Sequence, residues 1–493
     1  MNTASRPGLR RQIDSQVMRW QARLDSDWAD RFLPWIGAGL LSLIFFVLAE
    51  AKVRSGDASP SLAAAAQGAW LIGHFKTPHL TLTDTHLLAQ HLPLGFYPVG
   101  WATRFLPTVP TLLGLQAVSL GVGVVPLWRI ARDIALLRAG AAVALCAAYG
   151  LSPTLNNLDL SGFHPAAVAV SPLLGATYLA LRGKWRAFAI VSATAVMWSA
   201  ELGLVIAGLG LLVFLQGERK VGRRTIIAGL AWTIVAVLVI EPRYGSTGFI
   251  SPGAFRAYGD NAFSILFGMA GHPFKLLGDL FAEDNVRLIV GLLAPLLFLP
   301  VLAPRYLLPA VPLQVLYLVA DVPVRGTGTN EYGLPLTVFA FVAATFALQR
   351  MGRRSIERVL VDRRVLIALA VGAVGFFLLD AANSPYQRPW EWGRQDATDR
   401  SREHAADLAL PNDRVRVSAS MVVLLAERTI LYPMGSAPDA TLALDGVNRV
   451  VIDGADVAWS TTDWLSFGAG MQSHGYRLEM AENGVRVYSA ASG

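Results

Sequence analysis

The side chains best suited to chemistry in this sequence are acids and histidines that lie outside its apolar runs. We predict that three carboxylates are catalytic, namely Asp57, Asp84 and Glu201. A carboxylate can act as the general base that takes the proton of an attacking hydroxyl group. Histidines and arginines follow these acids along the chain, and their N–H groups stabilise phosphate oxygens. Together they indicate group transfer from a phosphate-bearing donor.

A second set of polar residues is predicted to contact the donor phosphate or the substrate. Its members are His91, His164, Arg243, Arg256, Glu331 and Tyr332. Histidine is costly in hydrocarbon, so the absence of all eight histidines from the apolar runs is expected. The histidines also avoid the basic loops, which favours polar chemistry on the opposite face. Ordinary structural roles stay open for several candidates: Asp84 as a helix N-cap, His164 as an interfacial cap, and both arginines as lipid-headgroup contacts.

Common motifs for other reactions are absent from the sequence. It contains no Walker loop, no G-x-G-x-x-G and no G-x-S-x-G, and no histidine pair has metallopeptidase spacing. The single cysteine, Cys146, excludes an intramolecular disulfide and a cysteine-rich zinc site. We therefore predict no certain cofactor, and a divalent cation held by the outer acids stays open.

Composition places the chain in a membrane. Of its 493 residues, 54% are hydrophobic and 16% are charged, and the mean hydropathy is +0.45. Soluble domains carry about 25% charged residues, so an ordinary soluble enzyme is excluded. The net charge is +7, but the arginines gather in short loops between apolar runs, as the positive-inside rule describes. This distribution excludes a nucleic-acid partner.

The apolar runs predict a polytopic α-helical protein with about eleven transmembrane helices. They lie near 35–52, 110–127, 139–151, 165–181, 187–199, 202–215, 225–240, 287–302, 306–320, 335–348 and 365–379. The stretch from Lys184 to Arg224 is basic at both ends, so we predict two helices with Glu201 at the outward turn rather than one long helix. This alternation places the N-terminus in the cytoplasm and the C-terminus outside, in a multi-pass protein of the plasma (inner) membrane.

Three regions follow from these runs. Residues 1–33 are predicted as a cytoplasmic tail, 34–381 as the transmembrane domain, and 382–493 as a small extracytoplasmic α/β domain. Within the transmembrane domain, residues 53–108 form an outer loop with membrane-surface helices. In the last region, Arg414–Ser418, Thr429–Tyr432 and Arg449–Asp453 read as strands, Met421–Arg428 and Ser460–His474 as helices, and Tyr476–Tyr488 as a hairpin turning at Asn483-Gly484.

Several segments resemble one known family. They include Gln67-Gly-Ala-Trp70, His91-Leu-Pro-Leu, Gly162-Phe-His-Pro165, Glu201-Leu-Gly-Leu and Ser418-Ala-Ser420. In their order and spacing they resemble an uncharacterised bacterial family of predicted membrane proteins, grouped with the type C (GT-C) integral-membrane glycosyltransferases. The resemblance implies a GT-C-like fold, a polyprenyl-phosphate sugar as donor and a carboxylate base in the first outer loop. Four positions at which the family carries other polar residues are Ser61, Gly162, Ser199 and Glu331 here.

The resemblance favours an envelope glycosyltransferase that moves a sugar from a polyprenyl-phosphate donor to a glycan or lipid acceptor at the outer face. Asp57 is the preferred base. The four departures favour a second hypothesis, a catalytically inactive scaffold or accessory subunit that binds lipid-linked glycan. A transporter or flippase of lipid-linked sugars is the third hypothesis. Its ion-coupled form is disfavoured because the predicted spans lack an acid or base at their centre.

Overall fold

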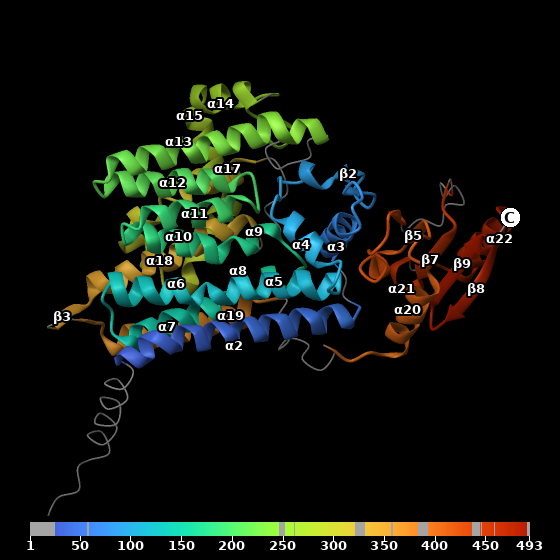
Figure 1. Ribbon diagram of the computed structural model, residues 1–493, viewed down its shortest axis with the longest axis horizontal. Helices are drawn as coiled ribbons and strands as arrows, with labels where there is room; N and C mark the ends of the chain where they lie inside the picture. Colours follow the sequence, from blue (N-terminus) through green and yellow to red (C-terminus); the bar gives the residue numbers. More distant parts are fainter. Residues whose placement is uncertain are drawn as a thin grey trace, which may run out of the picture.

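The computed structural model describes residues 25–56, 59–245, 252–260, 262–320, 331–355, 358–382, 393–435, 444, 446–457 and 459–490. Within these residues, long helices lie side by side in a bundle, and a small domain that contains a sheet packs against one end of it (Figure 1). The predicted mostly helical membrane fold with a C-terminal α/β domain is confirmed at this level.

The bundle is built from helices that coincide with the apolar runs. They are α2 (Asp27–Arg54), α5 (Thr108–Val122), α6 (Val124–Arg129) with η2 (Ile130–Ile134), α7 (Ala139–Gly150), α10 (Val170–Leu181), α11 (Trp185–Val196), α12 (Leu202–Leu215), α13 (Arg219–Val235) with η3 (Ala236–Ile240), α17 (Val311–Val319), α18 (Leu334–Met351) and α19 (Arg363–Asp380). Four described stretches are long and apolar enough to cross a membrane, namely 27–54, 108–134, 219–244 and 334–351. The number of spans therefore stays a prediction.

Helix α18 is the centre of the bundle. Its residues from Leu334 to Leu348 are all buried, as expected for a helix that is apolar on every side. The hydroxyls of Thr337 and Thr345 donate to the carbonyl oxygens four residues earlier, so neither leaves an unpaired polar group in this core.

Two predicted spans are interrupted: 306–320 is α-helical only over Val311–Val319, and 287–302 is broken. Helix α16 (Glu283–Leu293) ends early, and three short turns follow: η6 (Ala294–Leu296), η7 (Leu299–Leu302) and η8 (Pro304–Leu307). Pro295 and Pro300 have no N–H to donate, and Leu297 and Phe298 between them adopt left-handed backbone conformations. A continuous helix over 287–302 was therefore a wrong prediction.

Short elements connect the long helices, and those nearest the C-terminal domain lie at the end of the bundle that we call the outer end (Figure 1). The short elements are α3 (Pro60–Gly73), β1 (His79–Leu80), β2 (Thr85–His86), η1 (Leu87–Ala89), α4 (Phe96–Ala102), α8 (Pro153–Leu160), α9 (Pro165–Val168), η4 (Glu241–Tyr244), η5 (Pro252–Phe255), α14 (Ala262–Gly271), α15 (Pro273–Leu280) and η10 (Glu331–Gly333). Helices α3 and α4 occur where surface helices were predicted. Helix α3 is buried from Leu62 to Gly73 inside the protein, and whether these helices lie at a membrane surface stays a prediction.

The C-terminal domain is a five-stranded mixed sheet with helices. Its elements are α20 (Ala397–Leu408), β5 (Val415–Val417), η11 (Ala419–Met421), β6 (Leu431–Pro433), β7 (Arg449–Asp453), α21 (Gly454–Val457), α22 (Thr461–Ser473), β8 (Tyr476–Glu482) and β9 (Val485–Ala490). The strand order is β6-β5-β7-β9-β8, and β5 is parallel to both of its neighbours. The hairpin is confirmed: Asn483 and Gly484 both have positive φ, as a tight two-residue turn requires. The predicted helix Met421–Arg428 was wrong, since η11 ends at Met421 and no helix follows it up to Arg428, and α20 was not predicted.

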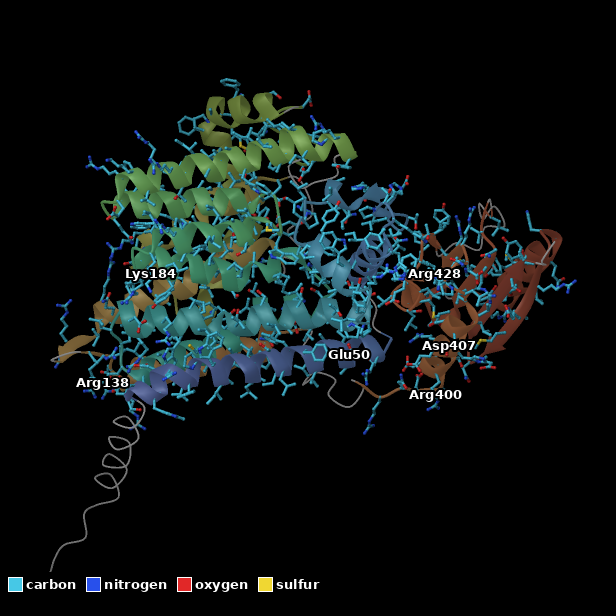
Figure 2. The ribbon with its side chains drawn as sticks, in the orientation of Figure 1. Glu50, Arg138, Lys184, Arg400, Asp407 and Arg428 are labelled. Atoms are coloured by element: carbon cyan, nitrogen blue, oxygen red, sulfur yellow. The ribbon has the colours of Figure 1, made fainter. Side chains whose placement is uncertain are left out.

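The C-terminal domain docks on α3 and the β1–β2 hairpin. Thr81 Oγ1 donates to the carbonyl oxygen of Leu431 at 2.9 Å and accepts from its N–H at 2.8 Å. The buried Gln67 amide donates to the same hydroxyl at 2.8 Å. Figure 2 places Arg138 and Lys184 at one end of the bundle and Glu50 at the other, beside this domain. The basic loops and the C-terminal domain thus lie at opposite ends, as the predicted orientation requires, and the orientation itself stays a prediction.

Candidate functional site

Two adjoining cavities lie beside the β1–β2 hairpin at the outer end of the bundle. The larger, about 280 Å³, is lined by Ser61, His91 and His164 among others. The smaller, about 30 Å³, is lined by His91, Ser199, Glu201 and Tyr332 among others. His91 and Pro165 line both, so the two cavities form one site, which we call the outer-end site. It brings together four of the residues predicted from sequence: His91, His164, Glu201 and Tyr332.

Backbone pairing holds His91 against the turn that carries Glu201. The N–H of Ala200 donates to the carbonyl oxygen of His91 at 2.8 Å, and the N–H of Gly95 donates to the carbonyl oxygen of Met197 at 2.9 Å. His91 and Leu92 both have positive φ, at 60° and 50°. A left-handed conformation costs a residue with a β-carbon about 1–2 kcal/mol. Strain of this kind gathers at functional sites, where the surrounding structure enforces it.

His91 is hydrogen-bonded to the buried side chain of Glu201. His91 Nδ1 contacts Glu201 Oε1, and the Ser199 hydroxyl donates to Oε2. The Glu201 side chain is 2% exposed, whereas that of His91 is 37% exposed. Burial opposes ionisation of Glu201, but the charge and hydrogen bond of His91, with the bond from Ser199, outweigh it and lower the Glu201 pKa. The carboxylate thus fixes the orientation of the imidazole, whose second nitrogen, Nε2, can exchange a proton with a substrate.

A second buried acid lies near this pair and was not predicted. Glu241 is 2% exposed, and its Oε1 has no hydrogen-bond partner in the described part of the chain. It begins η4 and interacts electrostatically with Glu201 and His91. An available signal was an acid directly before Pro242, at the end of an apolar run. Across the described ranges, no group of three or more acids, histidines or cysteines could hold a metal ion.

His164 is held by a buried glutamine. Gln116 Oε1 accepts from the His164 backbone N–H at 2.8 Å, and Gln116 Nε2 donates to the carbonyl oxygen of Gly162 at 2.9 Å. The Ser161 hydroxyl lies 2.9 Å from His164 Nε2. Gln116 therefore fixes the loop that presents His164 to the larger cavity.

Two of the positions that depart from the family pattern face each other. A β-carbon added to Gly162 would lie 2.6 Å from the Ser61 hydroxyl and 2.3 Å from that of Ser59. Gly162 also has a φ of +126°, which favours glycine. Neither position carries a carboxylate in this chain, so this face of the site offers hydroxyl groups.

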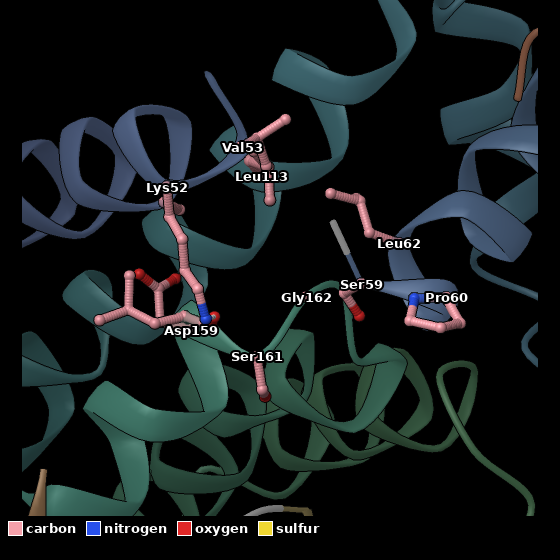
Figure 3. A pocket seen from close by; sticks show the side chains of 11 residues that line it. Lys52, Val53, Ser59, Pro60, Leu62, Leu113, Asp159, Ser161 and Gly162 are labelled. Atoms are coloured by element: carbon pink, nitrogen blue, oxygen red, sulfur yellow. Dashed lines mark hydrogen bonds between the residues drawn. The ribbon is translucent and has the colours of Figure 1, made fainter. Parts of the chain in front are cut away.

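A third cavity, about 280 Å³, adjoins the outer-end site through Pro60 and is lined by Lys52 and Asp159 (Figure 3). Lys52 Nζ donates to the carbonyl oxygen of Leu160 at 2.7 Å. Asp159 is 1% exposed, and neither carboxylate oxygen has a hydrogen-bond partner in the described structure. Burial raises the pKa of Asp159 well above its usual range, and the nearby Gln116 amide offsets only part of this.

We expect Asp159→Asn to raise the thermal unfolding temperature at pH 7 and to have a smaller effect at pH 4. With its raised pKa, folded Asp159 binds a proton more tightly than the unfolded chain does, so its contribution to stability falls as the pH rises above the unfolded pKa. Asparagine removes this loss because it is neutral at every pH. Thermal scans at the two pH values measure the effect, with Asp84→Asn, at a fully solvated position, as the control. An equal shift at both pH values would contradict the assignment.

The other candidates that the structure describes do not line the outer-end site. Asp84 is 96% exposed and pairs with His79 at 3.2 Å on the β1–β2 hairpin. Arg243 and Arg256 are exposed and line none of the cavities described above. Glu201 pairs with His91. Asp57 and the side chain of Glu331 lie outside the described structure.

Comparisons with known proteins identify relatives at the level of family and fold. The family described as "Predicted membrane protein (DUF2079)" matches residues 61–487. The fold is similar to that of ArnT from Cupriavidus metallidurans bound to undecaprenyl phosphate, with 11% sequence identity, a TM-score of 0.52 and coverage of 92% of this chain and 98% of that one. The apo state of the same ArnT matches with 12% identity, a TM-score of 0.52 and coverage of 92% and 99%. No curated protein matches the sequence.

Proposed function

Because this chain belongs to the DUF2079 family of predicted membrane proteins, and its fold resembles that of ArnT, we propose that it is a type C glycosyltransferase. In this proposal it moves a sugar from a polyprenyl-phosphate donor to a glycan or lipid acceptor at the outer face of the plasma membrane. The observation that carries the proposal is the outer-end site. Two histidines and a buried carboxylate meet there in adjoining cavities, in a fold shared with a protein that binds undecaprenyl phosphate.

The residues divide into two roles. The acceptor hydroxyl gives its proton to His91 Nε2, while Glu201 holds the opposite ring nitrogen and stabilises the imidazolium that forms. The acceptor oxygen forms a bond to the anomeric carbon of the sugar as the bond from that carbon to the donor phosphate breaks. The phosphate leaves with the electron pair, and His164 and the Ser61 hydroxyl stabilise its oxygens from the larger cavity. The second pKa of a phosphate monoester is about 6, so this leaving group needs no ATP and no added proton at neutral pH.

The test is turnover of a defined donor. Detergent-purified protein is incubated with a panel of undecaprenyl-phosphate sugars and an envelope extract as the source of acceptor, and released undecaprenyl phosphate is quantified by mass spectrometry. We expect release from one class of sugar donor and none from the others. If folded protein neither binds nor discharges any donor, the proposal is wrong.

One observation favours a second function. Ser61 and Gly162 face each other without a carboxylate at either position, which suits a protein that binds the donor but does not transfer its sugar. In that case native mass spectrometry would show a retained undecaprenyl-phosphate sugar, while the turnover assay would stay at background. The two assays together therefore separate an enzyme from a donor-binding scaffold.

A further inference from the structure

A groove of about 460 Å³ lies between α11 and α13, and it shares no lining residue with the outer-end site. Its walls are α11 and α13, and Ile206 of α12 also lines it. Each helix contributes residues three or four positions apart, from Trp185 to Val196 on α11 and from Val221 to Trp232 on α13. This spacing places them in one stripe on each helix.

The dimensions of the groove suit one lipid chain. Both helices begin at a basic loop, so they run in the same direction across the bundle. Each stripe covers twelve residues, or about 18 Å at 1.5 Å per residue. One leaflet of the hydrocarbon core is about 15 Å thick. The groove therefore has the length of a single leaflet.

The groove has a basic side chain near one end and buried hydrogen-bond donors further along. Arg224 lines it near the basic start of α13, where Arg219, Lys220 and Arg223 also lie. Further along, Ser192 is 7% exposed, and its hydroxyl has no hydrogen-bond partner in the described residues. The indole nitrogen of Trp232, near the other end of the groove, is also buried and has no hydrogen-bond partner in the described residues. A buried donor without a partner is costly, so a ligand that accepts hydrogen bonds would relieve that cost.

We propose that this groove binds an anionic phospholipid of the cytoplasmic leaflet. Its phosphate would meet Arg224, an ester oxygen would accept from the Ser192 hydroxyl, and one acyl chain would follow the apolar stripe. The basic loops mark the cytoplasmic end by the positive-inside rule. A polyprenyl phosphate fits less well, because the proposed donor phosphate lies at the opposite end of the bundle and would leave Arg224 without an anion.

The test is lipid retention by the full chain. Delipidated protein in detergent is titrated with phosphatidylglycerol, phosphatidylcholine or undecaprenyl phosphate and observed by native mass spectrometry. We expect a preference for phosphatidylglycerol over phosphatidylcholine, and Arg224→Gln should weaken phosphatidylglycerol binding by about fivefold, as expected for one basic side chain at an anionic headgroup. Arg223→Gln is the matched control, because Arg223 is its exposed neighbour and does not line the groove.

A second pair of variants tests the groove itself. Ala193→Trp fills it and should abolish the preference, whereas Ile190→Trp, at a 66% exposed position of the same helix outside the groove, should not. Equal retention of both phospholipids, or equal effects of the two arginine variants, would overturn the proposal. So would a preference for undecaprenyl phosphate that Ala193→Trp removes. The proposal does not depend on sugar transfer, which is measured separately.

Discussion

Glu201→Gln is expected to lower the rate of sugar transfer by about 10²- to 10⁴-fold, the range that a positioned acid or base contributes. The substitution preserves shape but removes the negative charge that fixes the ring orientation of His91 and stabilises its protonated form. His91 would then lose its basicity at the step that takes the acceptor proton. His91→Gln is expected to cause a loss of similar size, because the two side chains act as one unit.

Initial rates of undecaprenyl phosphate release measure this effect, and thermal unfolding shows whether each variant is folded. Glu218→Gln is the control, since Glu218 is an exposed acid at the basic end of the bundle. If folded Glu201→Gln protein transfers sugar within twofold of the wild-type rate, the His91–Glu201 pair is not the base.

Arg132→Met is expected to cause the largest loss of stability among single substitutions at the basic end. Arg132 is fully buried, and its guanidinium donates to Asp30 at 2.6 and 2.9 Å and to Asp25 at 2.7 Å. Arg358, on the β3–β4 hairpin (Arg353–Ser355 and Arg358–Leu360), pairs with Asp30 at 3.5 Å. These contacts tie the start of α2 to η2 and the hairpin. Removing one partner of a buried ion pair costs about 3–5 kcal/mol, because the remaining charge is left uncompensated.

Thermal unfolding of the detergent-purified protein measures this loss. Arg129→Met, one turn earlier on α6, is the control, since Arg129 forms no ion pair in the described part of the protein. Adding Asp25→Asn and Asp30→Asn to Arg132→Met should recover part of the stability, because the uncompensated charges are then gone. If the triple variant unfolds at the same temperature as Arg132→Met, charge compensation is not the cause.

Local signals predicted the local structure well. Helix α12 begins and ends at the predicted Leu202 and Leu215, and β7 matches Arg449–Asp453, because each is a short apolar run with clear ends. The Asn483-Gly484 pair correctly predicted the turn of the last hairpin. Predictions were wrong where the tertiary structure overrides the helix expected from the hydrophobic pattern of the sequence. The apolar run 287–302 breaks between its prolines, and the predicted helix at Met421–Arg428 gives way to a turn with a buried core segment.

The outer-end site shows the same limit. Sequence reasoning selected His91, His164, Glu201 and Tyr332 separately, from residue type, predicted side and family resemblance. It did not pair His91 with Glu201, because 110 residues separate them and the contact depends on a loop with left-handed residues. Arg132 counted only as one more basic loop residue, whereas it is fully buried against two acids. Spacing within one segment cannot reveal contacts of this kind.

The most direct test of the proposed function is a structure of the detergent-solubilised protein with undecaprenyl phosphate bound. We predict density for the phosphate in the larger cavity, within hydrogen-bond distance of His164 and Ser61, with His91 beside it and still paired with Glu201. Phosphate density elsewhere on the protein, or an empty outer-end site at a saturating concentration of the lipid, would contradict the proposal.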